Sequence, residues 1–270
     1  MIEFLLSRTA LDSLYLPAAI CAAFIAFAPT REKPHPTGLA ISLAFLMGLL
    51  MVRPLPVWPP VGGIGYLPFL GLLGLGFGLA ADRPRYRLFA CALFVLCLPA
   101  LATILVGSQE YGGRLRGTIW LIYPLLIIAG MIVFGRLIGT GSRPAAGRAL
   151  FFASLALGVV AWLYGSRISL HALGLAAVIL SALLVLPRLG LKWPLSASFA
   201  AGSFYFTIAA TLILSRDLLA LPVAISFFAF FIPGMGPFLG MKHKNHRSML
   251  ELAAGSLIVL AAGLSYLYAP

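Results

Sequence analysis

Long apolar runs, separated by short clusters of basic residues, proline and glycine, dominate this sequence. A helix needs about 20 apolar residues to cross the hydrocarbon core of a bilayer, which is about 30 Å thick. We therefore expect an all-α fold, a polytopic transmembrane helical bundle of about 10 spans. The candidate spans are residues 14–29, 38–52, 57–80, 88–106, 117–137, 149–164, 168–186, 195–214, 218–239 and 250–268.

The composition excludes an ordinary soluble domain and a disordered chain. Hydrophobic residues make up 61% of the 270 residues and charged residues only 10%, whereas about 25% of the residues in soluble domains are charged. About ten spans leave no room for a separate soluble domain, so we expect one integral membrane domain over residues 1–270. The net charge of +12 does not indicate a nucleic-acid partner, because the basic residues flank apolar runs as membrane insertion requires.

The distribution of basic residues predicts the orientation of the bundle. If the ten spans alternate in direction, 13 of the 19 lysines and arginines fall on one side, which the positive-inside rule assigns to the cytoplasm. Both termini are then expected outside, and the expected location is the plasma membrane, or the inner membrane of a bacterium. The six basic residues on the other side are Arg8, Arg53, Arg114, Arg116, Arg167 and Arg216.

Five spans in each half would start the halves on opposite sides of the membrane, as an inverted repeat requires. The halves would be residues 1–140 and 141–270. Their sequences show no convincing similarity, so the repeat is a hypothesis about geometry alone.

Glycine and proline interrupt two of the expected spans. Gly63 and Gly65 stand in a run that begins Trp58-Pro59-Pro60, and Pro233, Gly234 and Gly236 stand near the end of span 218–239. One interpretation is a broken helix beside a substrate path, because irregular backbone at membrane depth is tolerated when it lines a cavity. The other is that proline starts a helix and small residues allow close packing, as Gly74-x-x-x-Gly78 would.

Hydroxyl side chains form a stripe in span 195–214. Ser203, Thr207 and Thr211 recur every four residues and therefore share one helix face. The stripe could line a polar path or make ordinary contacts between helices. The residues assigned to a candidate substrate path are Gly63, Gly65, Ser203, Thr207, Pro233, Gly234 and Gly236.

The densest polar patch precedes the last span, and Glu251 follows it. Its cations suit anionic lipid head groups or another phosphate at the cytoplasmic face. Its two histidines lie three residues apart without an H-E-x-x-H motif, so we expect neither a metal nor a cofactor. The residues assigned to head-group or phosphate binding are Lys242, His243, Lys244, His246 and Arg247.

The leading hypothesis is a transporter-like protein that binds or moves a small organic or lipid-like solute. All seven acidic residues lie in loops or at span edges, which argues against a carboxylate relay through the membrane. One alternative is a membrane enzyme that acts on a phospholipid or polyprenyl phosphate, with His243 or His246 as general base. The other is a non-catalytic subunit or assembly factor. The expected partners are the bilayer, anionic head groups and, for a subunit, other membrane proteins.

Overall fold

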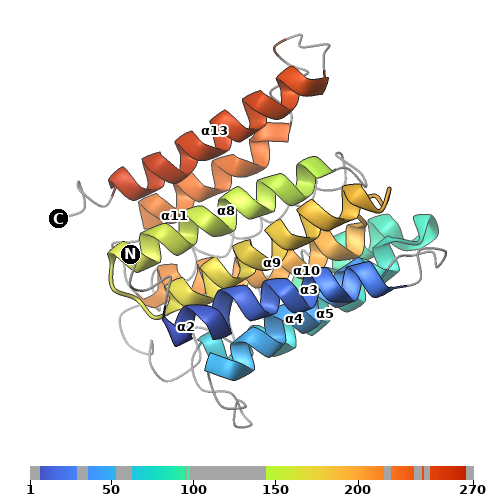
Figure 1. Ribbon diagram of the computed structural model, residues 1–270, viewed down its shortest axis with the longest axis horizontal. Coiled ribbons are helices and arrows are strands. Elements are labelled where there is room, and N and C mark those ends of the chain that lie inside the picture. The colour runs from blue at the N-terminus through green and yellow to red at the C-terminus, as the bar shows by residue number, and fades with distance from the viewer. Residues whose placement is uncertain are drawn as a thin grey trace.

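The computed structural model describes residues 7–28, 36–52, 63–94, 96–97, 144–215, 220–233, 239 and 244–265. Throughout these ranges the regular secondary structure is helical, and long helices lie side by side in a bundle (Figure 1). The elements are α2 (Arg8–Ala10), the π-helical turn η1 (Leu11–Tyr15), α3 (Leu16–Phe27), α4 (Thr37–Val52), the 3₁₀ turn η2 (Gly63–Tyr66), α5 (Leu67–Ala81), η3 (Pro84–Tyr86), α8 (Pro144–Leu163), α9 (Ile168–Arg188), α10 (Leu195–Ser215), α11 (Ala220–Phe227), the 3₁₀ turn η6 (Phe228–Phe231) and α13 (Lys244–Leu264).

Several of these helices can cross a membrane. In the described ranges, five are long and apolar enough, and three shorter apolar helices lie among them. The chain therefore has the helices of a multi-pass membrane protein. The count of about ten spans stays a prediction, because residues 117–137 and much of 88–106 lie outside the described ranges. The five long helices are Arg8–Phe27, Pro144–Leu163, Ile168–Arg188, Leu195–Leu212 and His246–Leu264.

Helix α10 forms the centre of the bundle, and its membrane-length segment is entirely buried. It packs against α5 through glycines. A methyl group on Gly78 would lie 2.6 Å from the Cα atom of Ser196, and a methyl group on Gly74 would overlap the Ser203 side chain. Rising numbers on α5 meet falling numbers on α10, so the two helices are antiparallel. Their backbones approach closely because glycine has no side chain.

The other helix pairs have the relative directions that alternating traverses would produce. Gly174 of α9 lies against the Ser13 carbonyl and Cys21 lies beside Ser181, so α9 is parallel to the first helix. On the opposite side of the bundle (Figure 1), α13 runs parallel to α8, because Gly255 packs on Phe152 and Glu251 pairs with Arg148. The side of the membrane on which each end lies stays a prediction.

Most of the described basic residues lie at one end of the bundle, which we call the basic end. Contacts among three segments assemble this end. The Asp82 carboxylate accepts hydrogen bonds from the backbone N–H groups of Leu195 (2.9 Å) and Ser196, and Gly147 packs on Trp193. The opposite end holds Arg8 and Arg167. The residues of the basic end are Arg83, Arg85, Arg87, Arg148, Arg188, Lys192 and Arg247.

Two helices begin earlier than the apolar runs predict. Helix α8 starts at Pro144 rather than near residue 149, and α13 starts at Lys244 rather than near residue 250. Proline is favoured in the first turn of a helix, where its missing N–H group has no partner to lose. The polar first turns continue as helix because Arg148 and Glu251 pair across the two helices. Lys244, His246 and Arg247 therefore belong to a helix and not to an interfacial loop.

The α5–α10 contact predicts a contrast between two glycines of one helix. Gly74→Ala overpacks the contact with Ser203, and overpacking costs about 1–3 kcal/mol. A methyl group on Gly76 meets no atom within 4 Å, so Gly76→Ala should be neutral or stabilising by up to about 1 kcal/mol. Thermal unfolding of the detergent-solubilised protein measures both changes. Equal melting temperatures for the two variants would refute the packing role of Gly74.

The basic end also predicts an orientation. Arg85 and Arg167 are exposed at opposite ends of the bundle. In a cysteine-free variant, an impermeant maleimide added to intact cells should label Arg167→Cys but should label Arg85→Cys only after permeabilisation, because basic ends stay in the cytoplasm. The reverse pattern would overturn the predicted orientation.

Candidate functional site

An apolar groove runs along the bundle between α3, α8 and α9, and we call it the α8–α9 groove. Its volume is about 800 Å³. The alanines Ala176 and Ala177 of α9 leave space there that larger side chains would fill. Only Tyr15, Trp162 and Ser181 bring polar side-chain atoms to its lining. The lining residues are Leu14, Tyr15, Ala18, Phe151, Leu155, Val159, Trp162, Leu163, Leu173, Ala176, Ala177, Leu180, Ser181 and Leu184.

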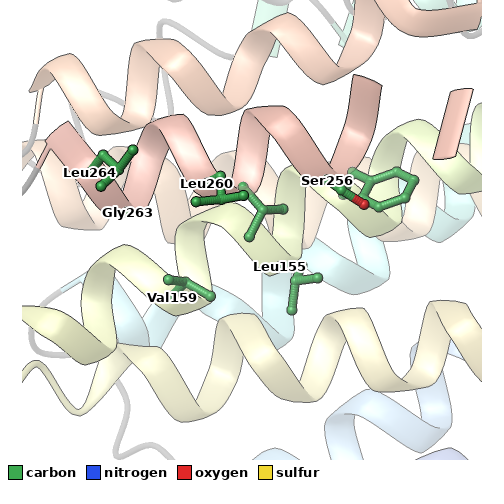
Figure 2. Close-up of a pocket in the computed structure, with 8 residues that line it drawn as sticks. Leu155, Val159, Ser256, Leu260, Gly263 and Leu264 are labelled. Atoms are coloured by element: carbon green, nitrogen blue, oxygen red, sulfur yellow. The ribbon is translucent and has the colours of Figure 1, made fainter. Parts of the chain in front are cut away.

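A second apolar groove lies on the other flank of α8, against α13, and we call it the α8–α13 groove. Its volume is about 430 Å³. Figure 2 shows Leu155 and Val159 of α8 facing Leu260 and Leu264 of α13. Gly263 contributes space, because a methyl group there would make only ordinary van der Waals contacts, with Val159 at 3.6 Å and Leu163 at 3.8 Å. Leu155 and Val159 line both grooves and so form a ridge between them.

An ion pair stands where the two grooves approach the basic end. The Arg148 Nε atom donates a hydrogen bond of 2.7 Å to Oε2 of Glu251, and the Nη2 atom donates to the same oxygen. Glu251 is buried and the Arg148 side chain is 27% exposed. Arg148 precedes Phe151 and Phe152 by about one helical turn, so it lies on the same side of α8 as the grooves.

The hydroxyl stripe of the predicted path lies within the packed core. Ser203 and Thr207 are buried. The Ser203 hydroxyl donates to the Ala200 carbonyl at 2.8 Å, and the Thr207 hydroxyl donates to the Ser203 carbonyl at 2.8 Å. These hydrogen bonds stay within α10. The arrangement is that of a helix contact whose hydroxyls are satisfied by the helix itself.

The predicted path residues lie against different helices. Gly63 and Gly65 belong to η2, which contacts α10 and α5, whereas η6, the turn before Pro233, contacts chiefly α8, α11 and α13. Gly234 and Gly236 lie outside the described residues. The described contacts therefore do not join the residues into one cavity, and their role in a substrate path stays a prediction.

The predicted head-group cluster is described in part. Lys242 and His243 lie outside the described residues, and Lys244 begins α13. His246 is exposed and Arg247 is half-buried in the first two turns of that helix. Among the residues that the structure describes, no three histidine, cysteine or acidic side chains gather as a metal site would require.

The sequence alone does not predict the two grooves. Beyond Arg148, helix α8 is apolar on nearly all faces, so no periodicity distinguishes its groove residues from its core residues. The sequence feature that could have indicated the grooves is the presence of small residues on α9 and α13 opposite large residues on α8. That signal has meaning only once the neighbouring helices are known.

The ion pair predicts a stability difference between two carboxylates. Glu251→Gln leaves the partly buried Arg148 without its charged partner, and the lost charge-assisted hydrogen bonds should cost about 1–3 kcal/mol. The matched control is Asp12→Asn. Asp12 pairs with the exposed Arg8 at 4.0 Å, an interaction that contributes about 0–1 kcal/mol. Thermal unfolding compares the variants, and an equal loss in both would contradict the proposed role of Glu251 in joining α8 to α13.

No protein-family model matches the chain, and a search of curated proteins finds no match. The function of the chain is accordingly inferred from its grooves, its charges and its helix contacts.

Proposed function

We propose that this multi-pass membrane protein is transporter-like and binds an elongated apolar or lipid-like solute in the α8–α9 groove. The observation that carries the proposal is the groove itself. Its volume of about 800 Å³ falls within the range of about 300–1,000 Å³ that small-molecule sites occupy. Its lining is almost wholly aliphatic and aromatic, so the solute must contribute apolar surface.

The arrangement of polar groups favours an apolar solute over a polar one. A site for a polar solute needs hydrogen-bonding groups directed into a cavity. The hydroxyls of Ser203, Thr207 and Thr211 instead donate to carbonyls of their own helix. Tyr205 of the same helix shares a hydrogen bond of 2.7 Å with Ser226 of α11. The donor hydrogens of these hydroxyls are therefore engaged within the protein.

Irregular helical turns supply points at which helices could move a bound solute. The π-helical turn η1 contributes Leu14 and Tyr15 to the groove wall. A second irregular turn, the 3₁₀ segment η6, follows α11 and precedes Pro233. π-helical and 3₁₀ segments within longer helices often mark functional sites or hinges. This is the basis for proposing transport in addition to binding.

The alternative of a membrane enzyme is weaker. It needs a general base near a phosphate, and Glu251 is engaged by two donors of Arg148. His246 is exposed on α13 and lines neither groove. For a non-catalytic subunit, the relevant surface would be α13, of whose membrane-length segment only 17% is buried. Bilayer lipid would cover that surface equally well.

The groove predicts the effect of filling it. Ala177→Phe places a ring in the α8–α9 groove and should weaken binding of a pyrene-labelled long-chain lipid at least about tenfold, equivalent to about 1.4 kcal/mol. Ala253→Phe is the matched control, because Ala253 is exposed on α13 and lines neither groove. Fluorescence titration of the purified protein measures both affinities. Equal affinities for both variants and the parent would refute the groove as the binding site.

A further inference from the structure

The two grooves together have the shape of a site for a lipid with two chains. They lie on the two flanks of α8 and share the ridge of Leu155 and Val159. The α8–α9 groove extends along α8 from Phe151 to Leu163, about 18 Å at 1.5 Å per residue. The other extends along α13 from Ser256 to Leu264, about 12 Å by the same rise. Half of the hydrocarbon core is about 15 Å thick, so each groove matches the depth of one leaflet.

Positive charge is concentrated at the basic end of these grooves. Arg148 lies one turn beyond the groove residues of α8, and Arg188 follows the groove residue Leu184 by one turn on α9. Arg247 precedes Glu251 by one turn on α13. Exposed Lys192 and His246 also lie at this end. Glu251 pairs with Arg148, and the described segments at this end hold more basic than acidic residues, so the described residues carry an excess of positive charge.

Arg148 retains capacity for a ligand while it holds Glu251. Its Nε and Nη2 atoms both donate to the single oxygen Oε2, and its Nη1 atom makes no hydrogen bond to the residues that the structure describes. The side chain is 27% exposed. A phosphate oxygen at Nη1 would form a charge-assisted hydrogen bond of the kind that arginine favours.

We propose that one anionic diacyl phospholipid straddles α8. One acyl chain occupies the α8–α9 groove, the other occupies the α8–α13 groove, and the phosphate lies at Arg148 between Arg188 and Arg247. This inference rests on the proposed function and names the lipid class that the groove takes. Among the described residues, the opposite end of the grooves holds fewer basic side chains. There Arg167 is joined by Arg8, which pairs with Asp12, so the head group is directed to the basic end.

The test uses the full chain, delipidated in detergent, and native mass spectrometry to count bound lipids. The titrants are phosphatidylglycerol, phosphatidylcholine with the same chains, lyso-phosphatidylglycerol and inorganic phosphate. We expect one phosphatidylglycerol bound most tightly, the lyso form and phosphatidylcholine more weakly, and inorganic phosphate without effect on either lipid. An arginine at a membrane surface changes the affinity for an anionic lipid about fivefold. Arg188→Gln should therefore reduce the preference for phosphatidylglycerol over phosphatidylcholine by about that factor.

Two further variants separate the parts of the proposal. Gly263→Leu fills the α8–α13 groove without a backbone clash and should reduce phosphatidylglycerol binding to the level of the lyso form. Arg167→Gln, at the opposite end, is the matched charge control and should change neither lipid. Both avoid Arg148, whose loss would also break the Glu251 pair.

The outcomes that overturn the proposal are distinct. Equal binding of phosphatidylglycerol and phosphatidylcholine would refute the head-group site and leave the apolar groove of the proposed function standing. Equal binding of the lyso form, with Gly263→Leu unchanged, would refute the straddling arrangement. Competition by inorganic phosphate would identify a phosphate site without lipid specificity. Failure of every lipid to bind, and of the pyrene-labelled lipid as well, would refute the proposed function itself.

Discussion

The close approach of α5 to α10 is the contact around which the described helices assemble. In a bilayer, apolar surface gains little by moving from lipid to protein, so helices associate through close packing and interhelical polar contacts. Gly71, Gly74 and Gly78 present such a surface, and the α10 residues Phe204, Ser203 and Ser196 fill it. With α10 buried on all sides, α4, α8 and α9 also pack on it. Helix α13 lies further out, and the two apolar grooves lie on the flanks of α8, one against α9 and one against α13.

The apolar surroundings that govern helix packing also determine where the polar side chains lie. Buried hydroxyls find partners on their own or a neighbouring element. Thr207 donates to a carbonyl within α10, and Tyr205 shares a hydrogen bond with the Ser226 hydroxyl of α11. Charged side chains stay at the ends, where Asp82 accepts from the first N–H groups of α10 and Glu251 accepts from Arg148. Most buried hydroxyls of the described interior are thus paired, whereas the buried hydroxyl oxygens of Ser42, Ser154 and Ser196 have no hydrogen-bond partner. The two apolar grooves lie on the periphery of the described helices, where the acyl chains of a bilayer would meet them.

Much of the fold followed from local patterns. The described segments of the apolar runs are helical, because a backbone in hydrocarbon must satisfy its own hydrogen bonds. The helix starts at Pro144 and Lys244 were missed, since the stabilising partner of each polar first turn lies on another helix. The candidate site was harder to predict from the sequence than the fold. The sequence places Ser203 in a stripe of hydroxyls, but only the tertiary structure shows its contact with Gly74 across the α5–α10 interface and its hydrogen bond to Ala200.

What the sequence by itself determined is the all-helical character of the described chain and the concentration of charge at helix ends, because the cost of exposing backbone or charge to hydrocarbon depends on residue type alone. What only the tertiary structure decided is the use of each small residue. Gly74 and Gly76 lie two residues apart on one helix, yet Gly74 packs against Ser203 and Gly76 faces open space. Gly263, on another helix, leaves space for a groove. The difference arises because a glycine has no side chain and therefore no fixed effect on packing. It allows a neighbouring helix to approach, or it leaves a groove, according to which residues lie opposite it.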